Sequence, residues 1–447
     1  MLRRQEDKLN YLKSYLGIAL ISYIVLSLYY AVIGYKDEIP QYMELARIFF
    51  LLDYVLMVSL AFTRIKSGNL FVLNSFFVLV TVILVKLFYL NSGVDVFGGA
   101  RDPYVALEYT FIKGTRSLGE FLDADGLINR FNRADFAFYG IFYTLYNIYP
   151  DKLFIVYGLV VINCIAVLIS SFMLYRLQMR LVPNDVQAKV ITMLYNSSPF
   201  VLSTVTNGMK EVMFLAIIIT AMYYIVKLHD KFNWLDLGKC LLVIFMARYF
   251  RSSLDYMLLV SLIVSITANE KNKRIYIIVL LASFLLLSSL LPVFITHVLG
   301  MDLEEIIKVA DYRMEQADTR NSLFVQVIPY LSALIGPFAQ LDRSGNYAFM
   351  HSAFIFLKSA MSLFFLLGVY RIVVLKSVRY FSILTFVFLS VYMVVVAGVS
   401  LDIRYHLIYI PFFFIIAVNW LKPNRKLDYL YLTICILLVM LYTTREI

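Results

Sequence analysis

Long apolar runs recur along the whole chain and constrain its fold more than any other feature. A helix that crosses a membrane needs about 20 mostly apolar residues. Apolar runs lie near 14–34, 43–63, 69–90, 153–175, 188–206, 211–227, 236–250, 253–268, 275–297, 349–373, 380–400, 406–421 and 427–443. Hydrophobic residues make up 61% of the chain, more than a soluble domain of this size can bury. We therefore predict one all-α domain over residues 1–447, a polytopic transmembrane helical bundle of about 11–13 spans.

Basic residues predict which loops face the cytoplasm. Clusters of Lys and Arg precede the first run and follow every second run, so one alternation puts them all on one side of the membrane. Cytoplasmic loops of membrane proteins carry an excess of Lys and Arg, which predicts a cytoplasmic N-terminus. The net charge of +10 resides largely in these clusters, so it favours contact with anionic lipid over nucleic-acid binding.

The cysteines and histidines predict neither a disulfide framework nor a metal site. The three cysteines lie inside apolar runs, and the four histidines are far apart in the sequence. Their spacings match no zinc or disulfide pattern. We expect no metal.

Two long loops, 91–152 and 298–348, fall on the side that this orientation makes external. Segment 136–149 of the first loop is rich in aromatic residues, and segment 323–340 of the second is apolar but interrupted by two prolines. Irregular backbone at membrane depth has to be buried in protein. We expect both segments to form interfacial or re-entrant helices that pack on the bundle.

Carboxylates in the first external loop are candidate catalytic bases. Asp102 lies in GGARDPY, just after the third run, beside Arg101, and Glu108 follows six residues later. A carboxylate at the outer membrane surface could accept the proton of a sugar hydroxyl. Gly-Gly and Asp-Pro are also ordinary turn sequences, so a purely structural role stays open.

Basic residues at the external ends of the runs are candidate phosphate ligands. Lys210 and Glu211 form a tight turn between two runs, and Arg248 lies inside an apolar stretch three residues before Arg251. Charged groups at membrane depth are costly and are usually functional or paired. We expect Arg248 and Arg251 to share a helix face and hold a diphosphate together. Snorkelling arginines and a helix start at Glu211 are the structural alternatives.

Further candidates lie near the C-terminus and in the second loop. Arg404 could hold a phosphate, and His406 could hydrogen-bond a sugar or a leaving phosphate, although Asp402 and Arg404 could also form a turn. Arg313 and Arg320 are weaker candidates for substrate contact, because their charged stretch is typical of a solvated helix face. No Gly-rich phosphate loop lies on the inner side, so a lipid-linked donor fits better than a nucleotide donor.

Four motifs carry a family resemblance: GGARDPYVALEY, YNSSPFVLSTVTNGMKE, ARYFRSSLDYMLL and RYHLIYIPFFF. In this order and layout, the chain resembles bacterial GT-C superfamily membrane glycosyltransferases, and most closely the Wzy-type repeat-unit polymerases of O-antigen, capsule or exopolysaccharide. The layout covers most of the chain, whereas the residue-level likeness is confined to these motifs. The resemblance implies an enzyme of the bacterial inner membrane with polyprenyl-linked substrates and no cofactor. It also implies partners such as a flippase and a chain-length regulator.

The resemblance also implies roles for individual residues. Asp102 would be the base, and phosphate would be contacted by Lys210, Arg248, Arg251 and Arg404. The expected activity is transfer of a growing glycan from undecaprenyl diphosphate to a lipid-linked acceptor outside the membrane. Three runs precede the acidic loop here, whereas several GT-C enzymes place it directly after the first span.

Two other functions stay open from the sequence. One is a GT-C transferase that uses a polyprenyl-monophosphate sugar as donor, and the other is a flippase of lipid-linked oligosaccharides or another transporter. A transporter is expected to carry ionisable residues along its spans. Inside the runs, Asp53 and Lys86 are isolated ionisable groups, and the richer clusters lie on the external side. The sequence therefore favours a polymerase.

Overall fold

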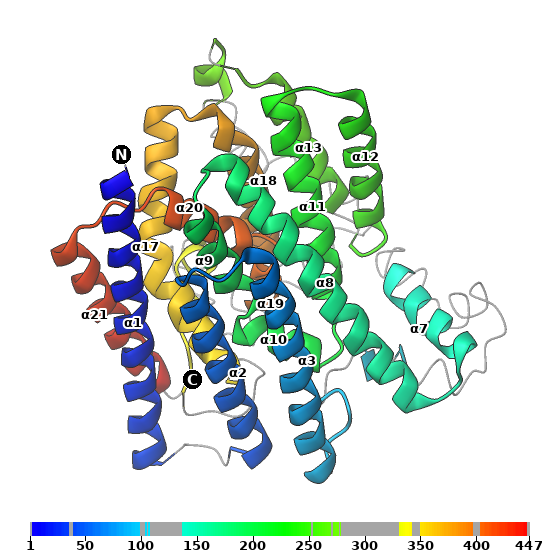
Figure 1. Cartoon of the computed structure of the whole chain (residues 1–447). Helices are drawn as coiled ribbons and strands as arrows, with labels where there is room; N and C mark the ends of the chain where they lie inside the picture. Colours follow the sequence, from blue (N-terminus) through cyan, green and yellow to red (C-terminus); the bar gives the residue numbers. More distant parts are fainter. Residues whose placement is uncertain are drawn as a thin grey trace.

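The chain folds into a bundle of helices (Figure 1). The computed structural model describes residues 2–34, 39–98, 103–104, 106–107, 136–251, 254–269, 271–276, 278, 330–341, 349–396 and 403–444. Every regular element in these ranges is a helix, which confirms the all-α class predicted from the apolar runs.

Among the described residues, seven stretches of helix are long and apolar enough to cross a membrane. They are α1 (Leu2–Ile33), α3 (Ser67–Asn91), α8 (Lys152–Leu181), α11 (Glu211–Asp230), α17 (Ser352–Leu375), η1 with α18 (Val378–Tyr380 and Phe381–Val396) and α21 (Arg425–Thr444). The shorter or less apolar helices are α2 (Gln41–Ala61), α7 (Phe136–Ile148), α9 (Asp185–Asn196), α10 (Pro199–Thr206), α12 (Trp234–Arg248), α13 (Leu254–Thr267), α19 (Ile403–His406) and α20 (Ile410–Asn419). The chain is therefore a multi-pass membrane protein.

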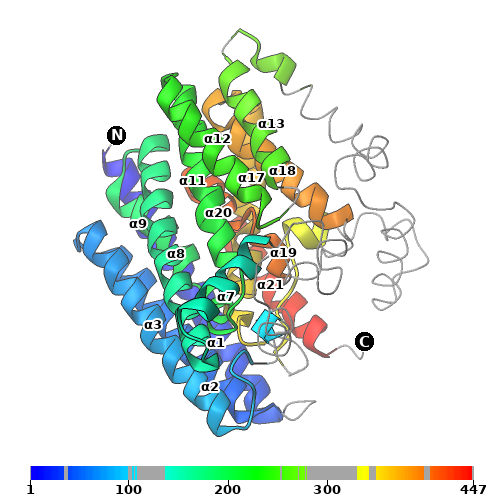
Figure 2. The same ribbon diagram turned by 90° about the vertical axis from the view of Figure 1, so that its right-hand side faces the viewer.

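The predicted run 188–206 is two helices rather than one. Proline has no N–H to donate and clashes with the preceding turn, so Pro199 ends the helical path of α9 and begins α10. The Ser198 hydroxyl accepts a hydrogen bond from the Val201 N–H at 3.3 Å and caps the new helix. Nearly every residue of α9 and α10 is buried, as is α20 up to Val418. Short helices thus form the centre of the bundle, where both views place α20 among the longer helices (Figures 1 and 2).

Asn419, the last residue of α20, joins five elements at one end of the bundle. Its side-chain oxygen accepts hydrogen bonds from Gln178 of α8 and Gln187 of α9, both at 2.6 Å. Its amide nitrogen donates to the Tyr380 hydroxyl at 2.9 Å, and its backbone oxygen accepts from Lys8 Nζ at 2.8 Å. The start of α1, the end of α8, the start of α9 and the α17–α18 connection therefore meet here.

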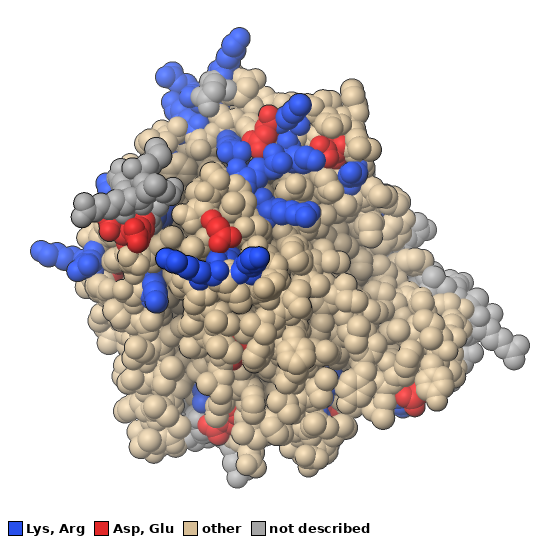
Figure 3. All heavy atoms as spheres, in the orientation of Figure 1, with Lys and Arg blue, Asp and Glu red and all other residues tan. Residues whose placement is uncertain are grey.

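Lys and Arg side chains concentrate at this same end, as the space-filling view shows (Figure 3). Arg180 of α8 and Arg379 of η1 both bind Asp230 at the end of α11, at 2.9 Å. We call this the basic end; it holds the start of α1 and the ends of α8, α11, α17 and α20. The opposite end, which we call the loop end, holds the starts of α11, α13 and α17. The basic clusters that follow every second apolar run in the sequence thus lie together at one end of the bundle.

Lys358, in the middle of α17, ties an irregular segment to the bundle. Its fully buried ammonium donates hydrogen bonds to the carbonyl oxygens of Ala333, at 3.0 Å, and Gly336. The same Nζ lies 3.2 Å from Nδ1 of His406. These carbonyls belong to segment 330–341, the described part of the predicted re-entrant segment 323–340. Within the described residues, the segment is helical over 330–334 and irregular over 336–340.

Two other buried lysines have the same role. Lys86 of α3 donates to the Val96 carbonyl at 2.5 Å, and Lys189 of α9 donates to the carbonyls of Thr63 and Ile65, both at 3.0 Å. In each case the acceptor lies outside regular helix, where a carbonyl has no intrahelical partner. Lys86, which appears isolated in the sequence, therefore has the Val96 carbonyl as its hydrogen-bond acceptor in the structure.

Replacing Lys358 is expected to loosen the bundle. Lys358→Met keeps most of the side-chain volume but removes the donor, and each buried carbonyl left without a partner costs about 1–3 kcal/mol. We expect a lower midpoint of thermal unfolding for the purified protein in detergent. Lys13→Met, which removes an exposed lysine from α1, is the matched control. Equal midpoints for the two variants would contradict this role of Lys358.

Candidate functional site

Two glycines let the start of the loop after α3 pack against the turn before α11. Gly98 has φ +61°, and a side chain there would lie 2.6 Å from a ring carbon of Tyr89 and 3.0 Å from the side-chain oxygen of Asn207. Gly208 has φ +65°, and a side chain there would lie 2.8 Å from the Phe97 ring. Only glycine accepts both the left-handed conformation and the close approach. The start of the loop therefore lies directly against the α10–α11 turn.

Four charged residues gather at the start of α11. Glu211 is the first residue of that helix and is only 8% exposed. The positive charges of Lys210, Arg251 and Arg404 all act on its carboxylate. We call these four residues the cationic cluster. The structure thus brings together three of the four basic residues predicted to bind phosphate, from three separate parts of the chain.

The described charges of the cationic cluster are three cations and one carboxylate, and the N-terminus of α11 adds a partial positive charge. One oxygen of Glu211, Oε2, is buried and has no hydrogen-bond partner among the described residues. Cations beside a helix N-terminus are suited to an anion, and phosphate oxygens fit arginine well.

Aromatic rings hold two of these cations. The Arg251 guanidinium lies 4.8 Å from the centroid of the Tyr405 ring, and Lys210 Nζ lies 5.9 Å from that of Phe138. A cation over a ring face is attracted by the ring quadrupole while its other side stays accessible. The rings come from α19 and α7, so two helices besides α11 shape the cluster.

Helix α7 confirms that the aromatic segment 136–149 is helical. The Ala137 N–H donates to the Tyr249 carbonyl at 3.1 Å, and the Phe136 and Tyr249 rings are 5.8 Å apart. These contacts attach α7 to the end of α12. The aromatic helix therefore packs on the bundle beside the cationic cluster, as expected.

Arg248 and Arg251, which the sequence predicts to hold a diphosphate together, have different neighbours in the structure. Helix α12 ends at Arg248, although the Arg251 N–H still donates to the Ala247 carbonyl at 3.1 Å. The Arg248 side chain is 60% exposed, and its Nε lies 4.0 Å from Oδ2 of Asp255. The Arg251 guanidinium stacks on Tyr405. The joint binding of a diphosphate by the two arginines stays a prediction.

His406 also differs from its prediction. It is completely buried, its ring stacks on Tyr409 with centroids 5.6 Å apart, and its Nδ1 faces Lys358. A sugar at the membrane surface would not meet this ring. The sequence does contain one sign of this buried position. Lys358 lies within an apolar run, and a lysine there needs polar partners in the protein interior.

Five further candidates, Arg101, Asp102, Glu108, Arg313 and Arg320, lie outside the described residues, so their roles stay predictions. Within the described ranges, no group of His, Cys, Asp and Glu residues is arranged to hold a metal ion. Among the described residues, the cationic cluster is therefore the candidate site for binding a substrate.

Glu211→Gln is expected to destabilise the cluster. The substitution keeps the shape but removes the charge that offsets three neighbouring cations, and unpaired like charges at a buried site repel one another. We expect a lower midpoint of thermal unfolding, with the difference shrinking in high salt because salt screens the repulsion. Glu6→Gln, at an exposed position of α1, is the control. A salt-independent difference, or none at all, would argue against the cluster.

Comparisons of the chain with models of protein families, with curated proteins and with solved structures gave no match. Fold alone does not define function in any case, since one fold can host many activities. The function is therefore argued from the chemistry of the cationic cluster and its place in the bundle.

Proposed function

We propose that this protein is a polysaccharide repeat-unit polymerase of a bacterial inner membrane. It transfers a growing glycan from undecaprenyl diphosphate to a lipid-linked acceptor on the external face of the membrane. The observation that carries the proposal is the cationic cluster: three basic residues and one buried carboxylate meet at the loop end of an apolar helical bundle.

The chemistry of the transfer needs positive charge in one place. The acceptor hydroxyl oxygen forms a bond to the anomeric carbon, and the bond from that carbon to the diphosphate oxygen breaks. Negative charge therefore grows on the leaving diphosphate, and fixed cations that meet it there lower the barrier. Arg251 and Arg404 supply planar donors for phosphate oxygens, and Lys210 supplies a compact charge. The hydroxyl proton goes to a base, for which Asp102 is the candidate.

Glu211 has a positioning role in this proposal. Three cations repel one another, and its carboxylate offsets that repulsion in the absence of substrate. When a diphosphate binds, the substrate supplies the opposite charge. Glu211 thereby keeps the phosphate site assembled between successive transfers.

The lipid part of the substrate has an apolar surface available nearby. Leu242 and Phe245 of α12 are more than half exposed, and they lie within two turns of the Arg248 end of that helix. A polyprenyl chain could rest on this face while its diphosphate reaches the loop end. Both substrates are anchored in the same membrane, so holding them side by side adds a proximity contribution to the rate.

A transporter is the second candidate, because one observation favours it. The broken path α9–α10 and the short α20 lie at the centre of the bundle, and discontinuous helices line the substrate sites of many transporters. The buried lysines weigh against it. Lys86, Lys189 and Lys358 donate to main-chain carbonyls, which gives them structural partners rather than a transport path.

Deleting the gene tests the activity. A polymerase mutant is expected to display glycans of single repeat units in place of long chains, as measured by gel analysis of surface polysaccharide. Retained long chains would reject the proposal. Chains of normal length that lack one sugar would favour the polyprenyl-monophosphate transferase, and lipid-linked repeat units trapped inside the cell would favour the flippase.

Alanine substitutions test the site. We expect Arg251→Ala and Arg404→Ala each to reduce polymerisation by about 10²–10³-fold, the typical loss when one group that stabilises the transition state is removed. The readout is glycan length in deletion cells that express each variant at the level of the unaltered protein. Arg176→Ala, an exposed arginine near the end of α8, is the control and should keep full activity. Full activity of both site variants would remove the assignment.

Labelling tests the orientation. The three native cysteines are buried, so single new cysteines can be labelled against a low background. Arg251→Cys and Arg404→Cys are expected to react with a membrane-impermeant maleimide on intact spheroplasts, whereas Lys66→Cys should react only after permeabilisation. The reverse pattern would put the cationic cluster in the cytosol, where the proposed donor is not used.

A further inference from the structure

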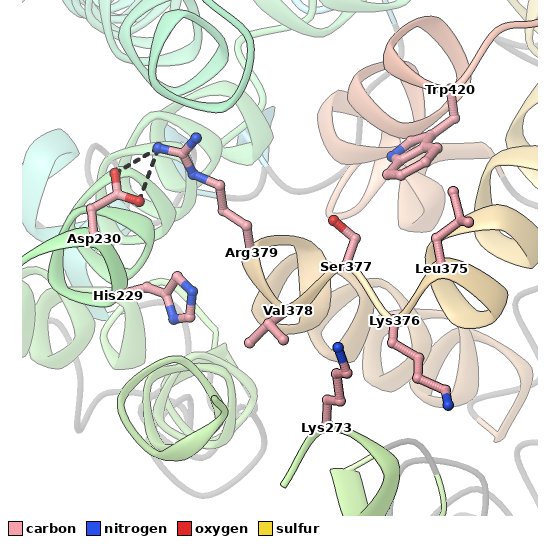
Figure 4. A pocket seen from close by; sticks show the side chains of 9 residues that line it. All are labelled: His229, Asp230, Lys273, Leu375, Lys376, Ser377, Val378, Arg379 and Trp420. Carbon is pink, nitrogen blue, oxygen red and sulfur yellow. Dashed lines mark hydrogen bonds and ion pairs between the residues drawn. The ribbon is translucent and has the colours of Figure 1, made fainter. Parts of the chain in front are cut away.

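A second polar site lies at the basic end, far from the cationic cluster. It is a pocket of about 670 Å³ between the end of α11, segment 271–276, the α17–α18 connection and the residue after α20 (Figure 4). The proposed polymerase activity makes no use of it. Its lining combines basic and apolar side chains, which suits a ligand with a charged part and an apolar part.

Trp420 and Arg379 form part of the pocket wall. In Figure 4 the nitrogen-bearing edge of the Trp420 indole faces across the pocket. Nε1 of Trp420 and Nε of Arg379 are themselves buried and have no hydrogen-bond partner in the part of the chain that the structure describes. The partly exposed cations of the lining, rather than these nitrogens, are therefore the groups that can bind a ligand.

The charge of the pocket is positive. Lys273, Lys376 and Arg379 line it, and Asp230 is the acidic residue among the lining side chains. That carboxylate is already shared by Arg379 and Arg180, each at 2.9 Å. In Figure 4, Lys273 extends from the opposite wall toward the α17–α18 connection. The charge of the pocket therefore suits an anion with several hydrogen-bond acceptors and disfavours a cation.

Lys376 occupies a position where glycine is the usual choice. It follows the last residue of α17 with φ 51° and ψ 50°, a left-handed conformation that residues other than glycine rarely adopt. The Ser377 N–H closes the helix end by donating to the Ile372 carbonyl at 3.0 Å. The backbone at this point thus places a lysine ammonium and a serine hydroxyl beside the same pocket.

Exposed apolar side chains flank these cations. Leu375 lines the pocket and is 63% exposed, and Ile275 and Ile278, which follow Lys273 closely, are 61% and 65% exposed. Such residues are unfavourable in water but suit the acyl region of a membrane. The pocket therefore has a polar part and an apolar flank, which matches a molecule with a phosphate head and a hydrocarbon tail.

We infer that this pocket binds the phosphate group of an anionic membrane lipid. Lys273 and Lys376 bind the phosphate oxygens, and the acyl chains lie along the exposed apolar side chains. Inorganic phosphate offers the same oxygens without the chains. The inference does not rest on the proposed polymerase activity, because it concerns the opposite end of the bundle.

Tryptophan fluorescence gives a direct test. The chain contains two tryptophans, and Trp234→Phe leaves Trp420 in the pocket wall as the only one. The full chain with this substitution is reconstituted into phosphatidylcholine vesicles that contain increasing fractions of brominated phosphatidylglycerol or brominated phosphatidylcholine. We expect saturable quenching by the anionic lipid beyond that by the neutral one.

Two double variants in the same background separate a site from general attraction. Lys273→Gln with Lys376→Gln should raise the half-saturating fraction of anionic lipid on the order of tenfold. Arg64→Gln with Lys66→Gln removes equal charge from exposed positions at the same end and should leave it unchanged. Equal quenching by both lipids, or equal effects of both pairs, would overturn the inference.

Inorganic phosphate distinguishes the two sources of the anion. Added in large excess to these vesicles, it should leave the extra quenching by brominated phosphatidylglycerol in place, because a lipid is held by its chains as well as its phosphate. Loss of all the extra quenching would show that a free phosphate occupies the pocket, and the lipid assignment would be wrong.

Discussion

The need to pair every main-chain polar group away from water governs this bundle. Inside a helix the backbone meets that need alone, but wherever the chain leaves helical geometry a donor must come from elsewhere. Lys358, Lys189 and Lys86 supply such donors to the carbonyls of irregular segments. Each lysine thereby fixes a connection onto the helices, and the α10–α11 turn and its charged neighbours are held in place on that framework.

The two ends of the bundle use positive charge differently. At the loop end, Lys210, Arg251 and Arg404 come from separate parts of the chain and lie close enough for their charges to act on a buried carboxylate, an arrangement suited to a transient, highly charged substrate. At the basic end, Lys273 and Lys376 flank a pocket beside exposed apolar side chains. That arrangement suits a resident amphiphile. The proposed activity and the proposed lipid site can therefore be examined independently.

Helices were predictable from the sequence, whereas contacts between distant segments were not. Apolar length and the alternation of basic residues are local signals, so they located the long helices and grouped most basic residues at one end of the bundle. Pro199 marks the break between α9 and α10 in the sequence, but the sequence does not show that both helices are buried. The contact of Arg248 with Asp255 depends on where α12 ends, which the sequence did not show. His406 was misjudged because its partner, Lys358, is 48 residues away in the sequence.

The Asn419 junction has a consequence for how the protein is made. Gln178 and Gln187 receive their hydrogen-bond partner from a residue 241 and 232 positions later. A ribosome releases α8 and α9 long before α20, so both amides enter the bilayer without that partner. At about 1.5 Å per residue, the ten residues of α20 are also too short to span a hydrocarbon core of about 30 Å. Integration therefore finishes only when α20, in the last tenth of the nascent chain, inserts between helices already in the membrane.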